Sequence, residues 1–374
     1  MYIFKKSSND LAIVAVCYEN ICQFEDNSNY GISHLLEHMI TDSYSDIEDK
    51  YDELCINNNA FTGSHEVVFY VKGLSSELDK VKQEYVKRVT NYKPSIEHFN
   101  KQKPIVYQEI LDLFTNSMSN TFFNSLTHKF NFISSGGIPE VIKNITFEQV
   151  EDFHSKYFKV TKIIEIGLDE TEEFKEFDYK KVIKQPFNKS SLLVPKPNSI
   201  SDDSINITIL SSKIEETEDS YYLPFITKLL SFGMKSPLYQ EIREKKGYVY
   251  WIGTDAVELD YFSHCLSIYT STSKDNVEAV SKRIIEVLNS PEEFLTEERF
   301  NLIKSNMLIQ NKIDFINNVS KYDLFLEGNR KNISIRSNFD NINYTDMLKY
   351  YKENIQPEIN KYSIYTELNF TKGN

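Results

Sequence analysis

The first half of the chain alternates between short apolar runs and amphipathic stretches. The run Leu11–Cys17 is too short to span a bilayer, and it predicts a buried strand over residues 11–18. Glu66–Lys72 is rich in β-branched and aromatic residues, which predicts a second strand. Apolar residues at helical spacing predict helices over 31–41, near Tyr51, over 78–89 and from about Pro104 onwards.

The character of the chain changes between Lys184 and Asp203, where three prolines lie among Asn, Ser and Lys residues. Before this stretch, Thr146 and Gln149 have the spacing of a capping box that opens a helix. After it, isoleucines at 205, 207 and 209 alternate with polar residues and predict a half-buried strand. Further elements are expected as helices over 220–232, 236–245 and 277–288 and strands over 247–257 and 264–271. The pattern predicts two α/β halves, residues 1–184 and 204–374, joined by a linker at 185–203, and the similar order of elements suggests a duplicated unit.

The composition narrows the class of protein. With 42 basic and 55 acidic residues, the 374-residue chain has a formal charge of −13 and no block rich in Lys and Arg, so we expect no nucleic-acid partner. The 24 Tyr and 25 Phe supply enough buriable surface for a folded protein of two domains. The first apolar run lacks the cleavage site of a signal peptide, and the four cysteines form no CxxC pair. We therefore expect a cytoplasmic protein with no membrane association.

The strongest candidate for chemistry is the sequence His34-Leu-Leu-Glu37-His38. On a helix, positions i, i+3 and i+4 share one face, so both imidazoles and the carboxylate point the same way. Two histidines one turn apart can bind one divalent ion, and the glutamate beside them can activate a water at that ion without being a ligand. Chance gives only about 0.02 such motifs in a chain of this composition. The alternative is a helix whose histidines are ordinary core or surface residues.

The surroundings of this motif resemble the pitrilysin-type metallopeptidases, a family of inverted zincins. The segment from Gly31 to Met39 is similar to the family's glycine-led zinc helix. Asn59-Ala-Phe-Thr62 is similar to its Asn-Ala-x-Thr segment, and Val106-Tyr-Gln-Glu-Ile110 resembles the helix that supplies a glutamate ligand. The resemblance implies one zinc ion per chain. It implies that the metal ligands are His34, His38 and Glu109 and that the general base is Glu37.

The same resemblance assigns residues to substrate binding. Asn59 and Ala60 are implied to lie on an edge strand, to which a peptide adds as a further strand. In the second half, Ser236–Tyr250 is similar to the family's Arg-x6-Tyr segment, which implies that Arg243 and Tyr250 bind the substrate carbonyl and stabilise the oxyanion. Preformed donors of this kind lower a barrier most in a water-poor site. The alternative for Arg243 is a solvated helix residue among its charged neighbours.

Two features depart from the family pattern. The interval from His38 to Glu109 is 71 residues, a few shorter than the family norm. Gln102 stands where the family often has a glutamate, seven residues before the ligand, and the loss of an outer carboxylate commonly costs about 10–100-fold in affinity or activity. Glu84 is a more distant rival for the third ligand. The other five histidines have no partner at ligand spacing and are expected to be structural or exposed: His65, His98, His128, His154 and His264.

The resemblance implies an α+β fold of two homologous α/β-roll halves, with antiparallel-rich sheets packed with helices, forming half of a clamshell peptidase chamber. The implied function is a zinc-dependent endopeptidase that hydrolyses short peptides in an enclosed chamber or matures a ribosomally made peptide. A second copy or a homologous chain would complete the chamber as a homodimer or heterodimer. Two alternatives stay open. One is a non-catalytic scaffold or recognition subunit of a heterodimeric processing peptidase. The other is a small-molecule zinc hydrolase, which leaves the Arg243 segment unexplained.

Overall fold

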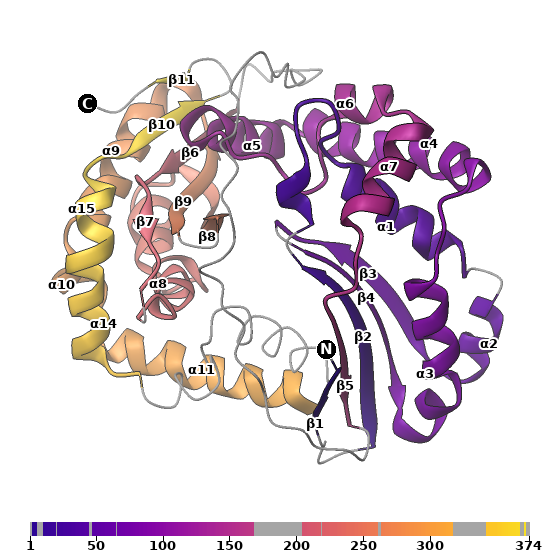
Figure 1. Ribbon diagram of the computed structural model, residues 1–374. Helices are drawn as coiled ribbons and strands as arrows, with labels where there is room; N and C mark the ends of the chain where they lie inside the picture. The colour runs from indigo at the N-terminus through magenta and orange to yellow at the C-terminus, as the bar shows by residue number, and fades with distance from the viewer. Residues whose placement is uncertain are drawn as a thin grey trace. The chain divides into compact units, whose positions relative to one another are not determined.

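The chain folds into two compact units, each a β-sheet packed with helices (Figure 1). The computed structural model describes residues 2–5, 10–19, 21–44, 47–64, 66–167, 204–217, 219–260, 263–316, 342–366 and 370–371. The first unit takes residues 1–112, 134–193 and 312–333, and the second takes 113–133, 194–311 and 334–374. Residues 113–133 therefore belong with the second unit, although they fall within the expected first half. The expected linker at 185–203 and His65 lie outside the described residues.

The sheet of the first unit has the strand order β1-β5-β2-β4-β3. Its strands are β1 (Tyr2–Lys5), β2 (Leu11–Glu19), β3 (Asn57–Thr62), β4 (Glu66–Leu74) and β5 (Lys162–Ile166). All pairings are antiparallel except that of β1 with β5. Strand β2 is buried on both faces, as its continuous apolar run predicts. Strand β3 lies at one edge of this order, paired with β4 among the described strands.

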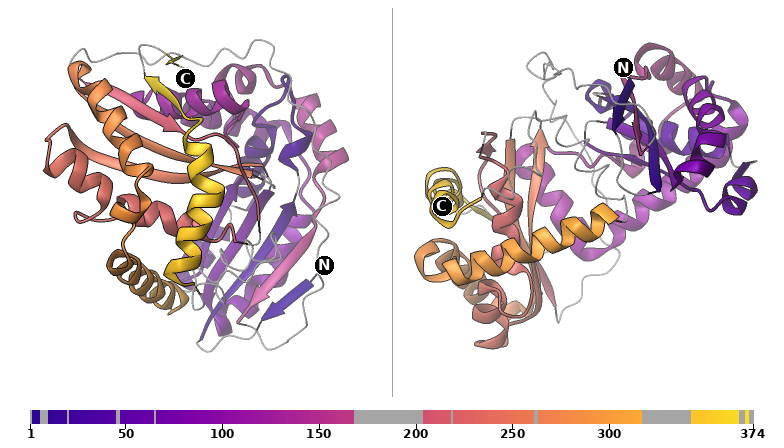
Figure 2. Two further views of the ribbon diagram at one scale, coloured as in Figure 1. Left: turned by 90° about the vertical axis from the view of Figure 1, so that its left-hand side faces the viewer. Right: turned by 90° about the horizontal axis from the view of Figure 1, so that it is seen from below.

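The helices of the first unit gather on one face of this sheet, as the views in Figures 1 and 2 agree. They are α1 (Ile32–Asp42), α2 (Glu48–Glu53), α3 (Ser75–Thr90), α4 (Ile96–Thr115), α6 (Pro139–Asn144) and α7 (Phe147–Tyr157), with a 3₁₀ turn, η1, at Cys22–Phe24. Helix α1 packs on β3 and β4, and α3 packs on β2 and β4. The capping box predicted at the start of α7 is confirmed, because the Gln149 N–H donates to Thr146 Oγ1 and the Thr146 N–H donates to Gln149 Oε1.

The prediction that a helix begins near Pro104 is wrong. Helix α4 begins at Ile96, and Pro104 lies inside it. Ser95 supplies the start, because its hydroxyl accepts from the His98 N–H at 3.2 Å and its carbonyl from the Phe99 N–H at 3.0 Å. The proline removes one hydrogen bond of a 20-residue helix, whose buried face still anchors it through Phe99, Val106, Ile110 and Phe114.

The second unit contains an antiparallel sheet of order β11-β10-β6-β9-β7, with β8 also paired to β9. Its strands are β6 (Ile205–Leu210), β7 (Ile214–Glu215), β8 (Val249–Asp260), β9 (Ser263–Thr272), β10 (Ser363–Thr366) and β11 (Phe370–Thr371). Its helices are α5 (Ser117–Phe130), α8 (Tyr222–Ser231), α9 (Val277–Leu288), α10 (Pro291–Phe294), α11 (Glu297–Ile316), α14 (Tyr344–Tyr350) and α15 (Gln356–Ile359), together with a 3₁₀ turn, η5 (Lys274–Asn276), and two π-helical turns, η4 (Tyr239–Glu244) and η6 (Tyr351–Ile355). The last residues of α11, from Lys312, are grouped with the first unit.

Strand β6 is buried along its whole length, which corrects the expectation of a half-buried strand. Ile207 and Ile209 join the core formed with α8 and α9, whereas Leu210 joins a second cluster that contains Leu126 of α5. Because alternate residues of a strand point to opposite faces, both faces of this sheet are covered, and the polar Asn206 and Thr208 are enclosed as well. The sequence pattern could not show that α5 returns to cover the second face.

The two units share one topology. Apart from the short elements α2 and β7 and the turns η1, η4 and η5, a strand, a helix, two strands and a helix follow in order in each unit, as β2-α1-β3-β4-α3 and as β6-α8-β8-β9-α9. A later strand, β5 or β10, then pairs beside the first, so that the orders β5-β2-β4-β3 and β10-β6-β9-β8 correspond. The expected α+β fold with two related halves is thus confirmed. Among the described residues, no helix combines the length and the apolar character needed to cross a membrane.

Candidate metal centre

Helix α1 holds the His34-x-x-Glu37-His38 motif between the sheet and neighbouring helices. It begins after Gly31, whose positive φ of 92° a residue with a side chain rarely adopts. His34 and Glu37 are each only 8% exposed, so this face of the helix is polar and nonetheless buried. Polar groups are costly to bury without partners, which marks the motif as more than a surface helix.

The third expected ligand reaches this motif from α4. Glu109 Oε1 lies 3.8 Å from His34 Nε2, and Glu109 Oε2 lies 3.4 Å from His38 Nε2. One ligand atom of each of these three residues lies within 4.8 Å of the others. Ligands at about 2.0–2.1 Å from a tetrahedral zinc stand about 3.3 Å apart, so the donor set and its spacing fit a zinc ion.

The rival ligand Glu84 is engaged elsewhere. Its carboxylate accepts from Lys50 Nζ at 3.0 Å and pairs with Arg88 at 3.4 Å on α3. Gln102 lies two turns before Glu109 on α4 and is 7% exposed, so a neutral amide occupies a buried place on the ligand helix.

His34 is oriented by the turn that precedes α6. Its Nδ1 lies 3.3 Å from the carbonyl oxygen of Gly136, a contact that makes Nδ1–H the donor and leaves Nε2 for a metal. Burial, and then the neighbouring His38 imidazole, lower the pKa of His34. The neutral ring is the form that binds metal, so the environment favours the ligand state.

Glu37 is poised beside the cluster. The hydroxyl of Thr62, on the edge strand β3, donates to Glu37 Oε2 at 2.6 Å. Burial raises the pKa of Glu37 to about 7; the nearby charge of Glu109 adds to this, and the Thr62 hydrogen bond opposes it. A carboxyl group with a pKa near neutrality can both take and return a proton. The resemblance named the segment that contains Thr62 without indicating this contact.

The expected substrate residues Asn59 and Ala60 lie on β3, the strand against which α1 packs. Asn59 is exposed, and its Oδ1 accepts from the Ala60 N–H at 2.8 Å. The edge strand and the candidate metal ligands therefore belong to one unit.

Arg243 and Tyr250 belong to the second unit. The Arg243 guanidinium lies 4.7 Å from the ring centroids of both Tyr239 and Tyr250, and its Nη1 donates to the Tyr250 carbonyl at 2.7 Å. The Tyr250 side chain is 77% exposed. Stacking against aromatic rings fixes the plane of a guanidinium. Tyr239 was not singled out from the sequence, although its place four residues before Arg243 on a helical turn is a usable signal.

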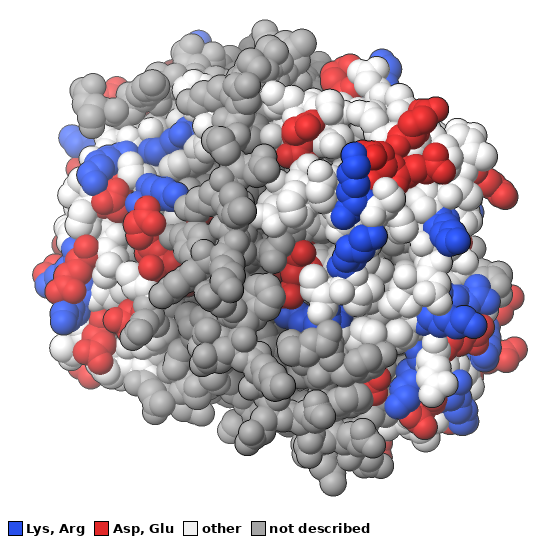
Figure 3. Space-filling view, in the orientation of Figure 1, with Lys and Arg blue, Asp and Glu red and all other residues white. Residues whose placement is uncertain are grey.

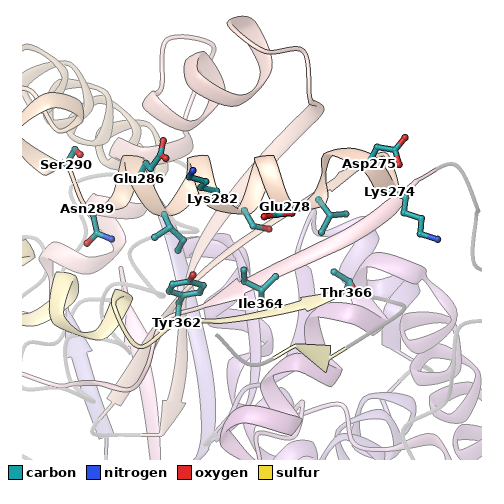
Figure 4. A pocket seen from close by; sticks show the side chains of 13 residues that line it. Lys274, Asp275, Glu278, Lys282, Glu286, Asn289, Ser290, Tyr362, Ile364 and Thr366 are labelled. Atoms are coloured by element: carbon teal, nitrogen blue, oxygen red, sulfur yellow. The ribbon is translucent and has the colours of Figure 1, made fainter. Parts of the chain in front are cut away.

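A separate groove of about 870 Å³ lies between α9 and the β10 region of the second unit (Figure 4). Lys282 and Glu286 of α9 stand opposite Tyr362 there. Its lining carries both charge signs and no histidine or cysteine. Figure 3 likewise shows acidic and basic side chains interspersed over the described surface, so the net negative charge does not gather into one field on that face.

Comparison with known proteins identifies the family. Residues 4–130 match the model described as insulinase, peptidase family M16, and residues 144–307 match the M16 peptidase inactive domain. The chain belongs to the M16, or pitrilysin-type, metallopeptidase family. An uncharacterized zinc protease of Rickettsia felis is 25% identical over 319 residues, which cover 78% of this chain and 77% of that protein.

Further relatives extend this likeness. A crystal structure of a protease from Helicobacter pylori has a TM-score of 0.74 at 16% identity, covering 97% of this chain and 95% of that one, which shows the shared fold. A probable mitochondrial-processing peptidase subunit beta of Arabidopsis thaliana is 20% identical over 210 residues, covering 52% of this chain and 40% of that protein. The family thus includes zinc proteases and a chain named as a subunit.

Proposed function

We propose that this M16 family member is a zinc-dependent endopeptidase. The observation that carries the proposal is the convergence of His34 and His38 from α1 with Glu109 from α4. The buried Glu37 carboxyl group stands on the same face of α1. Three protein ligands with an adjacent acid-base group are typical of a hydrolytic zinc site, which keeps one position open. The half-exposed Glu109 leaves the cluster accessible from one side.

Zinc held by these residues would lower the pKa of a water and polarise the scissile carbonyl. Glu37 takes the proton from the attacking water as general base, and it then donates this proton to the leaving amine. The Thr62 hydroxyl holds the Glu37 carboxylate in place for both steps through its 2.6 Å hydrogen bond. The Gly136 carbonyl keeps the His34 ring in the orientation that presents Nε2.

The substrate is proposed to be a short peptide that adds to the edge of β3 that no described strand pairs with. Asn59 and Ala60 offer backbone groups at this edge, next to the helix that carries Glu37. A peptide that uses the Ala60 N–H must first displace the Asn59 amide oxygen that now accepts from it. Arg243 and Tyr250 of the second unit are proposed to bind the scissile carbonyl and to stabilise its developing negative charge. Two kinds of natural substrate fit this proposal: short peptides in general, and the precursor of a ribosomally made peptide.

The working form is proposed to be a pair of such chains that encloses the substrate. The chain's likeness to a protein named as a processing-peptidase subunit supports pairing with a second copy or with a homologous chain. A strictly monomeric mass with full activity, measured by light scattering under assay conditions, would contradict this part of the proposal.

A second candidate function is that of a non-catalytic subunit. It is favoured by the match of residues 144–307 to a family domain described as inactive. That match begins after the last proposed metal ligand, however, and all three ligands and Glu37 lie in the part that matches the insulinase model. The retained cluster therefore favours catalysis.

The test is to incubate the purified chain with a mixed peptide library and to identify the products by mass spectrometry. Cleavage is expected with zinc and not with a chelator. Glu37→Gln should keep its zinc, because Glu37 is not a ligand, and it should lose about 10²–10⁴-fold in turnover, the usual contribution of a general base. Glu84→Gln, a substitution on α3, serves as the matched control and should behave as the wild type. Normal hydrolysis by Glu37→Gln would refute the mechanism, and a zinc-loaded wild type with no cleavage would favour the subunit function.

A further inference from the structure

Helix α1 begins without a side-chain cap of its own. Its N-cap residue is Gly31, and a glycine has no side chain to accept from the free N–H groups of the first turn. The ligand His34 is only the third residue of this helix. A shift of the first turn would therefore move the His34 side chain directly.

Glu25 supplies the missing cap from outside the helix. Its Oε2 accepts from the Gly31 N–H and its Oε1 from the Ser33 N–H, both at 2.9 Å. A carboxylate at a helix N-terminus is also favoured by the helix dipole. Both oxygens of one carboxylate thus accept hydrogen bonds from the backbone of the turn that contains His34.

The other side of this turn packs closely against the turn at Gly136 and Gly137. A Cβ on Gly31 would stand 2.8 Å from the Gly136 carbonyl oxygen and 2.9 Å from Gly137 Cα, which shows how closely the two segments touch. The same Gly136 carbonyl contacts His34 Nδ1 at 3.3 Å. The first turn of α1 is held between the Glu25 carboxylate and the Gly136–Gly137 turn, and the His34 ring is set by that arrangement.

We infer that Glu25 is a positioning residue for the metal centre, which fixes the first turn of α1 and thereby the direction of His34 Nε2. This inference rests on the proposed function, since it assumes that His34 binds zinc. Glu25 does not touch the reacting atoms or the ligand side chains. Its effect passes through two backbone N–H groups, so it should appear in metal affinity and in ligand geometry before it appears in the fold.

The test compares three variants in the full chain. Glu25→Gln keeps the size of the side chain but replaces one acceptor oxygen by an NH₂ group, which opposes an N–H. Glu25→Asp keeps both oxygens on a shorter stem. Asn343→Ala removes an ordinary side-chain cap from α14 of the second unit, where Asn343 Oδ1 accepts from the Asp346 N–H at 2.9 Å, and it controls for the general effect of losing a cap. Measurements at pH 8 keep Glu25 ionised, because burial raises its pKa to about 7.

Two readouts are taken on protein that circular dichroism shows to be folded: zinc affinity by competition with a chelator, and the absorption spectrum of the cobalt-substituted chain. Glu25→Gln is expected to weaken zinc binding by about 10–100-fold, the usual effect of an outer partner, and to shift the cobalt bands. Glu25→Asp should recover part of both. Asn343→Ala should leave both unchanged while it lowers the melting temperature.

Wild-type zinc affinity and cobalt bands in Glu25→Gln would overturn the inference and leave the proposed peptidase function standing. An equal loss of affinity in Asn343→Ala would also overturn it, because the effect would then be one of general stability. If Glu25→Gln does not fold, the decision rests on Glu25→Asp, whose stem is shorter by one methylene and cannot keep both 2.9 Å contacts unless the turn moves, and unchanged values there overturn the inference. A wild-type chain that binds no zinc would instead refute the proposed function, and this inference with it.

Discussion

The same helix of the shared topology carries different side chains at the motif positions in the two units. Counted from the first helical residue, His34, Glu37 and His38 of α1 correspond to Pro224, Thr227 and Lys228 of α8. Both helices bury apolar residues, and on α8 these are Tyr222, Leu223, Phe225, Ile226, Leu229 and Leu230. The fold therefore does not require the polar triad, which supports the proposed role of these residues of α1 in metal binding and catalysis.

The units also differ in what the neighbouring strand does for this helix. In the first unit, Thr62 of β3 donates to the Glu37 side chain. In the second, Thr254 of β8 donates to the backbone carbonyl of Thr227 at 2.8 Å. A similar contact between strand and helix thus holds the side chain of the proposed general base in one unit and only the helix backbone in the other. The predictions below test the proposed division between a unit that binds metal and a unit that does not.

The largest expected effect separates the two helices. His34→Ala should reduce zinc from about one ion per chain to background and abolish peptide cleavage, because two remaining ligands hold zinc poorly. Pro224→Ala, at the corresponding exposed position of α8, should leave both unchanged. Elemental analysis and a peptide assay on the two purified variants make the comparison. Equal zinc content in both would show that the metal, if any, is held elsewhere.

The second prediction asks whether the unit that lacks the proposed metal site takes part in the chemistry. Arg243→Gln should keep its zinc but lose about 10²–10³-fold in kcat, the usual cost of removing one donor to an oxyanion. The control is Arg283→Gln in the same unit, whose guanidinium pairs with Glu241 at 2.6 Å and Glu286 at 2.8 Å. Unchanged turnover in Arg243→Gln would confine the catalytic residues to the first unit.

The sequence predicted the parts of this comparison that depend on local spacing. His34, Glu37 and His38 were found because a helix fixes the face on which i, i+3 and i+4 lie. Glu109 came from the family resemblance alone, because no spacing rule links α1 to a carboxylate on α4. The contacts of Glu37 with Thr62 and of His34 with Gly136 join distant segments, and local patterns carry no record of them.

The errors in predicting the fold have the same origin. The start of α4 at Ile96 was missed because Pro104 is the stronger local signal, yet tertiary packing of the apolar face carries the helix through the proline. The full burial of β6 and the grouping of α5 with the second unit depend on which sheet face α5 covers. Periodicity describes one element at a time, so it cannot supply that information.

A third prediction locates the stabilising effect of metal. Zinc at about 100 times its dissociation constant should stabilise the native chain by about 2.7 kcal/mol, which corresponds to amide hydrogen exchange that is about 100-fold slower. Hydrogen exchange should slow in α1 and around Glu109 of α4, and it should not change in α8 or α9. The His34→Ala variant should show no response to zinc. Equal protection of both units would mean that metal stabilises the chain as one cooperative body.

The smallest expected effect distinguishes the proposed ligand histidines from an ordinary histidine of the first unit. The His154 ring stacks on Phe158 with a centroid distance of 5.6 Å, and its edge meets Tyr92 at 6.0 Å. Burial, and then the charge of Lys159, lower the pKa of His154 to about 4, below its ordinary value of 6.5. Between pH 6.5 and 4 the unfolded chain therefore takes up a proton that the folded chain does not, so stability falls as the pH falls through this window.

His154→Gln removes this contribution. Urea unfolding of the two metal-free proteins gives the difference between the free energies of unfolding of the wild type and the variant. This gap should be constant between pH 7 and 8. Below pH 6.5 the wild type should lose stability relative to the variant. The shift should be about 1 kcal/mol once the partial exposure of the ring is allowed for. Zinc content at pH 7.5 should be equal in the two proteins, because His154 is not a ligand. A gap that stays the same down to pH 4 would show that the folded chain accommodates a charged imidazole at this site.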